Sequence, residues 1–589
     1  MTQNSLLQII LYLLFIVVLI KPLGLYMAAV YEGKACFLDK IVKPLEKGIY
    51  RICCIQFQQE MNWKEYAITM LLFNLLGIIL LYLLQRFQVF LPLNPENFPS
   101  LSADLSFNTA NSFVTNTNWQ AYSGENTLSY FTQMIGLTVQ NFLSAATGMS
   151  ILAAFIRGIN RRESSTLGNF WVDTIRGILY ILLPLSIILA SILVSQGVIQ
   201  NFKKYQTVDL VQPIHYQESN SNISQSLTSQ RIPMGPVASQ VAIKQLGTNG
   251  GGYFNANSAH PFENPNAISN LFEMLAILLI PAALCYTFGA MIKDTKQGWA
   301  ILITMFILFI TTPFIVTVIE SRGDPNLINP EAVSTSSSNQ GLTHYSNMEG
   351  KEQRFGILSS SLWATLTTAT GNGSVNAMLD SFLPLSGLIP LWLINLGEVV
   401  FGGVGTGLYQ MLLFIIITVF VSGLMVGRTP EYLGKKIESF EMKMASFAIL
   451  IMPVVVLVCT SIGVSTDMGK SSILNPGTHG LTEILYAFSS MANNNGSAFA
   501  GLNANTPFYN IVGGLAMLIG RYWLAIPVLA IAGSLVKKKV IPTSSGTLPS
   551  HTPLFIVLLV SIVLIIGALT FFPVFALSAI VEHLMMFKE

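Results

Sequence analysis

The hydrophobic pattern of the chain is a succession of long apolar runs separated by polar linkers. Ten runs are long enough to cross a hydrocarbon core of about 30 Å as helices. They lie near residues 6–30, 67–89, 128–157, 172–197, 270–292, 298–320, 384–427, 441–464, 508–536 and 553–580. The seventh run is longer than 40 residues, so we expect its helix to be broken. The pattern predicts an all-α polytopic membrane protein.

Four uncharged stretches rich in Gly, Asn and Thr lie between these runs. Their centres, near residues 117, 250, 372 and 495, are 133, 122 and 123 residues apart, and a near-constant period indicates internal duplication. Each stretch follows a short run that we expect to be helical. The short runs are 101–113, 237–246, 357–367 and 481–491. The repeating unit is therefore an apolar helix, a short helix, the Gly/Asn/Thr stretch and a second apolar helix.

This repeat divides the chain into four pore units and two flanks. We expect four helix–pore-loop–helix units around a central pore, with flanking helices and about ten transmembrane helices in all. The expected parts are an N-terminal transmembrane helix and cytoplasmic loop (1–66), pore units 1 to 4 (67–157, 172–292, 298–427 with its broken last helix, and 441–536), and a C-terminal transmembrane helix (537–589).

Positive charges are divided unevenly between alternate linkers. One set carries 6, 4, 2, 4 and 3 Lys or Arg residues, together 19 of the 31 in the chain, in 31–66, 157–176, 293–297, 428–443 and 537–551. The other set is longer but carries 0, 4, 3 and 1, in 87–127, 198–269, 321–383 and 465–507. Because Lys and Arg accumulate in cytoplasmic linkers, the first set is predicted to be cytoplasmic. Both termini and all four Gly/Asn/Thr stretches are then on the outer side.

Composition excludes several classes of protein. Only 10% of residues are charged and mean hydropathy is +0.58, whereas a soluble protein has about 25% charged residues. The net charge of +2 does not indicate nucleic-acid binding. The chain lacks a Gly-rich phosphate loop and an Asp-Lys-Thr-Gly phosphorylation sequence, and its six histidines lack metal-ligand spacing. ATP would therefore be handled by another chain.

The four stretches suit the binding of a dehydrated alkali cation. Glycine permits backbone conformations in which carbonyl oxygens turn toward an axis, where they can replace the water shell of an ion. A short helix that enters from outside also directs its partly negative C-terminal end toward the ion. Any single stretch has the alternative interpretation of an ordinary outer turn, but four at matching positions favour a filter. The candidate ligand residues are Asn116, Thr117, Asn118, Thr248, Asn249, Gly250, Gly371, Asn372, Gly373, Asn494, Asn495 and Gly496.

Six longer motifs resemble a known family along essentially the whole chain. They are TNWQ at 117–120, GTNGGG at 247–252, GNGSVN at 371–376, GEVVFGGVG at 397–405, GRTPEYLGKK at 427–436 and NNNGSAF at 493–499. The family is the potassium-binding A subunit of the Kdp-type potassium-uptake ATPase. The resemblance implies the potassium-transporter superfamily fold and a non-catalytic, potassium-binding subunit in a bacterial or archaeal inner membrane. It also implies a P-type ATPase partner and small accessory subunits.

The alternative function is a stand-alone potassium channel or a cation-coupled potassium transporter of the same superfamily. A secondary transporter more often has inverted repeats, whereas these units repeat in one orientation.

The roles of three charged residues stay open at this level. Glu398 is either an ion-path carboxylate or a helix-end group in a packed turn. Arg521 either faces the pore or is satisfied by snorkelling or an ion pair. The loop from Arg428 to Lys436 either retains charge on the cytoplasmic side or docks the ATPase subunit. The glycines at 402–407 predict a broken segment under the filter, with close helix packing as the alternative.

Overall fold

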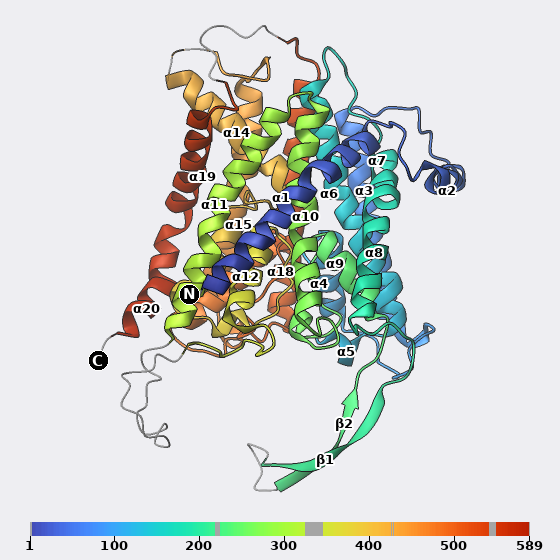
Figure 1. Ribbon diagram of the computed structural model, residues 1–589, viewed down its shortest axis with the longest axis vertical. Coiled ribbons are helices and arrows are strands. Elements are labelled where there is room, and N and C mark those ends of the chain that lie inside the picture. Colours follow the sequence, from blue (N-terminus) through green and yellow to red (C-terminus); the bar gives the residue numbers. More distant parts are fainter. Residues whose placement is uncertain are drawn as a thin grey trace.

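The computed structural model describes residues 3–217, 224–323, 346–425, 427, 429–540 and 549–587. Arg428 and residues 324–345 of the linker 321–383 lie outside the described residues. Within the described residues ten helices are long and apolar enough to span a membrane, which confirms the predicted number. The bundle they form is shown in Figure 1, with both termini toward the end that carries a projecting hairpin.

The spanning helices follow the predicted runs closely. They are α1 (Gln3–Tyr31), α3 (Trp63–Arg86), η2 (Thr132–Thr138) with α6 (Val139–Asn160), α7 (Phe170–Arg176) with η3 (Gly177–Leu182) and α8 (Leu183–Ser195), α10 (Ala267–Met291), α11 (Thr295–Arg322), α14 (Thr406–Met425), α15 (Ser439–Ser465), α18 (Pro507–Leu535), and α19 (Pro553–Phe575) with η8 (Ala576–Ile580) and α20 (Val581–Met585). Outward-facing side chains such as Leu14 and Val18 of α1 are more than half exposed, as expected for surfaces that contact lipid.

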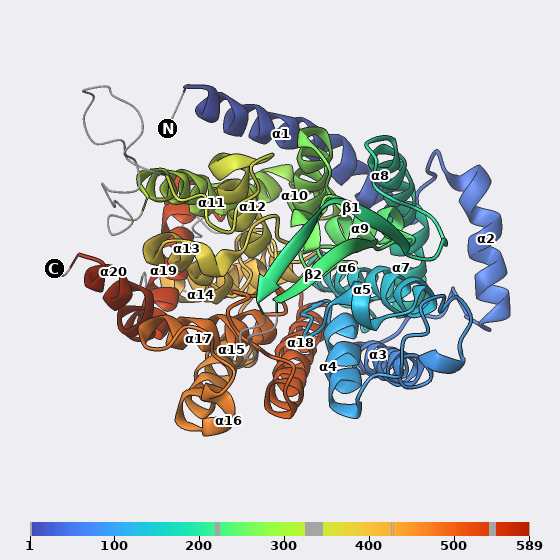
Figure 2. The same cartoon turned by 90° about the horizontal axis from the view of Figure 1, so that it is seen from below.

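Four short helices occupy the predicted positions between the spans. They are α4 (Ala103–Val114), α9 (Val237–Leu246), α12 (Gly356–Ala369) and α17 (Thr478–Ala492). Seen from below, they surround the middle of the molecule (Figure 2). Each is followed by one of the Gly/Asn/Thr stretches and then by a spanning segment, so the repeat predicted from spacing is present as a three-dimensional arrangement.

The seventh apolar run is broken, as predicted, but the break is larger than the glycine cluster at 402–407. Helix α13 (Pro384–Asn395) ends before it and α14 begins at Thr406, so the non-helical segment is 396–405. The break starts early because Gly397 and Glu398 both have positive φ, and Gly407 already belongs to α14. We call residues 396–405 the crossing loop.

Several elements in the linkers were not predicted. Strands β1 (Gln206–Gln217) and β2 (Ser224–Ile232) form the projecting antiparallel hairpin, and helix α2 (Asp39–Ile52) lies in the linker after α1. Short pieces complete the list: η1 (Gln88–Phe90), α5 (Gly124–Thr127), η4 (Asn257–Ala259), η7 (Leu379–Ser381), β3 (Glu431–Tyr432), β4 (Lys435–Lys436) and α16 (Asp467–Lys470).

Lys435 anchors the β3–β4 turn to the helix bundle. Its Nζ donates to the carbonyl oxygens of Gly158 (2.9 Å), Arg161 (2.5 Å) and Leu535 (2.7 Å), at the ends of α6 and α18. Burial lowers the pKa of Lys435 to about 8, and the charges of Arg162 and Lys538 act in the same direction. This lysine therefore holds the loop against the spans and is not a free surface charge.

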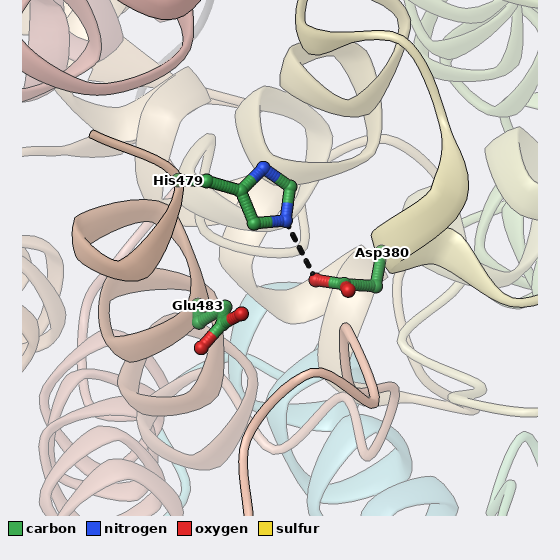
Figure 3. A group of neighbouring side chains, drawn as sticks. All are labelled: Asp380, His479 and Glu483. Atoms are coloured by element: carbon green, nitrogen blue, oxygen red, sulfur yellow. Dashed lines mark hydrogen bonds and ion pairs between the residues drawn. The ribbon is translucent and has the colours of Figure 1, made fainter. Parts of the chain in front are cut away.

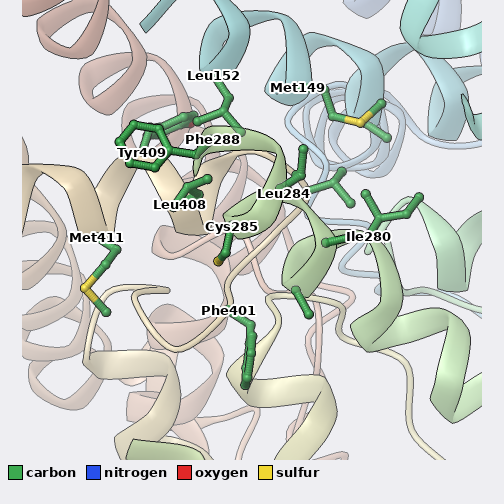
Figure 4. Packing of buried hydrophobic residues seen from close by; sticks show 14 of the residues in the cluster. Met149, Leu152, Ile280, Leu284, Cys285, Phe288, Phe401, Leu408, Tyr409 and Met411 are labelled. Carbon is green, nitrogen blue, oxygen red and sulfur yellow. The ribbon is translucent and has the colours of Figure 1, made fainter. Parts of the chain in front are cut away.

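The largest hydrophobic core lies between α1, α6, α10, α11 and α14. Figure 4 shows part of it, where Leu152 of α6 and Phe288 of α10 lie near Tyr409 of α14. The middle of the molecule, in contrast, is polar: eleven of the twelve candidate ligand residues are buried, Gly496 is partly buried, and each of the twelve is Asn, Thr or Gly. Polar backbone at membrane depth is tolerated only where it is hydrogen-bonded or lines an aqueous path. This polar centre is therefore the candidate ion-binding site.

Candidate ion-binding site

We call the four Gly/Asn/Thr stretches at 116–118, 248–250, 371–373 and 494–496 the candidate filter strands. Each follows the C-terminal end of its short helix, and the four helix ends are equivalent. The C-cap residues of the four helices are Thr115, Gly247, Thr370 and Asn493, and the residue after each of them has positive φ. Such a left-handed residue is a common helix terminator. Asn and Gly adopt it readily, whereas Thr248, with φ of 43°, is β-branched and strained there. The sequence therefore stops all four helices at the same register.

The twelve candidate residues form four aligned triplets. The first residue of each triplet has positive φ, at Asn116, Thr248, Gly371 and Asn494. The third residue also has positive φ, at Asn118, Gly250, Gly373 and Gly496. The middle residues are Thr117, Asn249, Asn372 and Asn495, and none of them has positive φ. This alternation keeps the strands from forming ordinary β-structure, in which successive carbonyls would point to opposite sides.

The middle residue of every triplet is attached to its own short helix by its N–H group. Thr117 donates to the Ser112 carbonyl (2.9 Å) and Asn249 to the Lys244 carbonyl (2.9 Å). Asn372 donates to Thr367 (3.0 Å) and Asn495 to Ser490 (2.9 Å), so the donor is always five residues after the acceptor. Each N–H is thereby held against the helix that supports the strand.

The carbonyl oxygens of the same four residues are left without a protein donor. Among the described residues, none of the carbonyls of Thr117, Asn249, Asn372 and Asn495 accepts a hydrogen bond. More than about nine in ten buried backbone polar groups are paired in native proteins. Four equivalent unpaired oxygens therefore point to a ligand that takes oxygen donors.

Close approach between the strands closes them into a ring. A Cβ atom built on Gly250 would lie 1.8 Å from the carbonyl oxygen of Asn372, and one on Gly373 would lie 2.2 Å from that of Asn495. A Cβ on Gly496 would lie 1.9 Å from the Thr117 carbonyl oxygen. The second strand thus touches the third, the third touches the fourth, and the fourth touches the first.

Asparagine side chains make the last contact of the ring and support the others. The Asn116 amide donates to the Thr248 carbonyl (2.9 Å), and the Asn118 amide donates to the Gly250 carbonyl (3.2 Å). Asn372 donates in the same way to Lys244, and Asn495 to Thr367, at 3.1 and 3.0 Å. These amides fix the backbone of neighbouring strands and, at Lys244 and Thr367, of the short helices α9 and α12. The asparagines therefore act here as positioning residues.

The crossing loop lies against the base of two of the strands. The Gly402 N–H donates to the Ala369 carbonyl (2.9 Å), and the Val404 N–H donates to Oγ1 of Thr248 (2.8 Å). On its other side, the ring of Phe401 makes edge contacts with Phe306 and Phe309 of α11, at centroid distances of 5.2 and 5.8 Å. Phe401 is labelled in Figure 4. The loop is thus attached both to the ring and to the core.

Two charged residues are buried here: Glu398, within the loop, and Arg521, beside it. A Cβ built on Gly371 would lie 2.5 Å from Oε1 of Glu398, so the carboxylate sits against the base of the third strand. Nη1 of Arg521 donates to Oγ1 of Thr406 (2.7 Å), at the start of α14. Arg521 is 4% exposed and has no carboxylate within ion-pair distance among the described residues. The arginine therefore neither snorkels to the surface nor forms an ion pair there.

Two buried ion pairs support the second and third units and were not recognised in the sequence. Lys244 of α9 contacts Glu263, and both side chains are essentially unexposed. Lys351 and Glu320 form the other pair, with 2.7 Å between Nζ and Oε2. Each partner lies in a different segment, so spacing along the chain carries no signal for either pair. The carbonyl of Lys244 also accepts the Asn249 N–H, which connects the first pair to the filter strand.

Fold and site together define a membrane protein of the four-repeat transporter class, in which one ring of backbone strands is shared by four helical units. The solved structure of the potassium transporter TrkH from Vibrio parahaemolyticus has this fold, with a TM-score of 0.51 at 13% identity over 86% of this chain and 96% of that one. Residues 10–584 match the family described as potassium-transporting ATPase A subunit. The chain belongs to this family.

Curated relatives match over their full length. A protein from Sorangium cellulosum is 58% identical over 586 residues, covering 100% of both chains, and one from Herpetosiphon aurantiacus is 59% identical with the same coverage. Both are described as potassium-transporting ATPase potassium-binding subunits.

Proposed function

We propose that this chain is the potassium-binding and translocating subunit of an ATP-driven potassium uptake pump. A dehydrated potassium ion binds from the outer side between the four strands and is then passed on together with a partner ATPase subunit. The proposal rests on the ring of unpaired carbonyls at Thr117, Asn249, Asn372 and Asn495. Carbonyl oxygens on a closed ring are the chemistry that replaces the hydration shell of a potassium ion.

The other candidate ligands fit the same role. The first and third residues of the triplets supply further carbonyls next to the ring, and their positive φ values set how these carbonyls turn. The four short helices end at the strands, and each C-terminal end contributes about half a negative charge. Together they favour a cation without placing a full negative charge in the path.

A pump subunit is favoured over a stand-alone channel or a cation-coupled transporter. The fold shared with TrkH suits all three, but the full-length relatives are named as subunits of an ATPase. We therefore assign ATP hydrolysis to a P-type ATPase subunit and expect small accessory membrane subunits in the same complex. Nucleotide binds to the partner and not to this chain.

The purified chain alone is expected to show no ATP hydrolysis, whereas the complete complex is expected to hydrolyse ATP in a potassium-dependent manner. The measurement is phosphate release at zero and saturating potassium, with sodium as the control ion. ATP turnover that persists after every copurifying subunit is removed would contradict the assignment. ATP hydrolysis by the complex that does not depend on potassium would contradict the proposed function of the ring.

We propose a bacterial or archaeal inner-membrane location with both termini outside. The uneven distribution of Lys and Arg between alternate linkers supports it. The proposed division into an N-terminal flank, four pore units and a C-terminal helix follows the same topology. In it, the hairpin β1–β2 is outside, and α2 and the β3–β4 turn face the cytoplasm.

Cysteine labelling tests this orientation. In a background in which the five native cysteines are replaced, Val211→Cys is expected to react with an impermeant thiol reagent in intact cells. Lys539→Cys is expected to react only after the cells are opened. Both positions are well exposed, Val211 at 102% and Lys539 at 82%. Lys435 is buried, so a cysteine at that position would not react with the reagent from either side. The reverse pattern of labelling would overturn the topology.

A further inference from the structure

We propose that Asp380, His479 and Glu483 form a binding site for a divalent transition-metal ion, with Zn²⁺ the best fit, on the same side of the molecule as the termini. One ligand atom from each side chain lies within 4.8 Å of the others. His479 and Glu483 are four residues apart near the start of α17, so they share one face of the helix. Asp380 comes from η7, after the third filter strand. Figure 3 shows the three side chains converging from these two elements.

The imidazole of His479 is already oriented for ligation. Its Nδ1 lies 2.7 Å from Oε1 of Glu582 in α20, and its Nε2 faces Oδ1 of Asp380 at 2.8 Å. A metal-binding histidine almost always donates its other ring N–H to a carboxylate or carbonyl, which fixes the tautomer and the ring orientation. Glu582 occupies that supporting position. The metal ion would replace the proton between Nε2 and Asp380.

The two carboxylate ligands are held in place by one short segment. Glu483 accepts the N–H groups of Leu474 and Asn475, each at 3.2 Å. The Asn475 side-chain amide donates to both Glu483 (2.9 Å) and Asp380 (3.2 Å). An ionised carboxylate has about four acceptor sites, so these bonds leave capacity for a metal ion.

The charges in this cluster are not balanced by the protein. Three carboxylates, from Asp380, Glu483 and Glu582, surround one imidazole. None of the three pairs with a Lys or Arg among the described residues. Even with a protonated imidazole, two negative charges remain in a partly buried position, where unpaired charge is costly. The His479 side chain is 20% exposed, which leaves access from solvent.

Gly501 makes room for the ligand atoms. A Cβ built there would lie 2.5 Å from Oε1 of Glu483 and 2.6 Å from both carboxylate oxygens of Asp380. A single methyl group would therefore fill the space beside the two carboxylates. Gly501 does not have positive φ, so alanine meets no backbone obstacle at this position.

The donor set selects the metal. One imidazole nitrogen and two carboxylate oxygens, with a further position for water, are ligands that Zn²⁺ accepts in tetrahedral geometry. Mg²⁺ instead demands near-octahedral oxygen coordination. A bound ion would join the segment after the third filter strand to the fourth short helix and, through Glu582, to the C-terminal helix α20.

The test is zinc binding to the purified chain after treatment with a chelator. Competition with a chromophoric chelator should reveal a Zn²⁺ site that Mg²⁺ does not fill. His479→Gln and Glu483→Gln should each weaken it by at least about tenfold, and Glu582→Gln by about 10- to 100-fold. His551→Gln, in an exposed linker, is the matched control and should leave binding unchanged. Zinc should also raise the Tm of the wild-type chain but not of His479→Gln.

Unchanged zinc affinity in His479→Gln would overturn the proposal and leave the cluster as a hydrogen-bonded imidazolium clamp. If the ligand variants do not fold, Gly501→Ala serves instead, because it blocks the site without removing a ligand. Zinc affinity that is unchanged in this variant would likewise overturn the proposal. With a zinc-selective chelator and excess Mg²⁺, which the hydrolysis of ATP requires, potassium-dependent ATP hydrolysis of the complex should persist in all these variants. The result is therefore independent of the proposed pump function.

Discussion

Gly250→Ala is expected to weaken potassium binding by at least about tenfold, which corresponds to about 1.4 kcal/mol. The new Cβ would lie 1.8 Å from the carbonyl oxygen of Asn372, so that one of the four ring oxygens must move. Residue 250 also has φ of 70°, where an L-side chain costs about 1–2 kcal/mol. The measurement is the potassium concentration that half-maximally stimulates ATP hydrolysis by the complex.

The ring geometry extends this prediction to two more strands. Gly373→Ala and Gly496→Ala should have similar effects, because their built Cβ atoms lie 2.2 and 1.9 Å from the carbonyls of Asn495 and Thr117. Two alanine substitutions serve as controls: Gly403→Ala, whose nearest atoms are 3.6 Å away, and Gly48→Ala, which meets nothing within 4 Å. Normal potassium affinity in all three filter variants would mean that the strands are turns and not a binding ring.

Shortening the crossing loop within residues 399–403 is expected to give potassium flux without ATP. A pump must not leak, so some part of the protein must obstruct the path inward from the ring. The loop is the structural candidate because it is hydrogen-bonded to Ala369 and to Thr248, at the base of two strands. Arg521, buried at the start of α14, adds a positive charge next to it. The measurement is potassium efflux from vesicles containing the complex, with and without ATP.

A matched pair of substitutions tests whether potassium leakage follows from a disturbed loop conformation or only from faulty assembly of the protein. Gly402→Ala should disturb the loop, because its Cβ would lie 2.1 Å from the Glu398 carbonyl oxygen and its φ is 62°. The neighbouring Gly403→Ala meets only ordinary contacts and should remain tight to potassium. A shortened loop that assembles normally and stays tight without ATP would show that the barrier lies elsewhere.

The four triplets show what a local sequence pattern can predict. Asn116 to Asn118, Thr248 to Gly250, Gly371 to Gly373 and Asn494 to Gly496 were predicted as equivalent sets from their period and composition. The structure aligns them in the same register, because the C-cap residue of each helix is followed by a Gly, Asn or Thr that takes positive φ. Helix ends depend on local backbone preference, and that preference is visible in the sequence.

The crossing loop shows what a local sequence pattern cannot predict, namely where the break in the helix begins. A span longer than 40 residues with clustered glycines predicted a break, but not its start at Leu396. That boundary depends on Glu398 lying against Gly371 and on Gly402 bonding to Ala369, which are contacts between separate segments. The orientation of Arg521 is another such case, since Thr406 is 115 residues away from it.

The sequence by itself determined the ten apolar spans, the four short helices, and the positions and register of the four Gly/Asn/Thr stretches. Hydropathy and helix termination depend on residues within a few turns of one another, and repeat spacing is a distance along the chain, so all three can be obtained from the sequence. Only the tertiary structure decided how the strands close into a ring, where the crossing loop lies, and which charges meet. The pairs Lys244 with Glu263 and Lys351 with Glu320, and the cluster of Asp380 with His479, join residues from separate segments. The physical reason is that these groups are brought together by the packing of the helices, and helix packing is not encoded in any one segment.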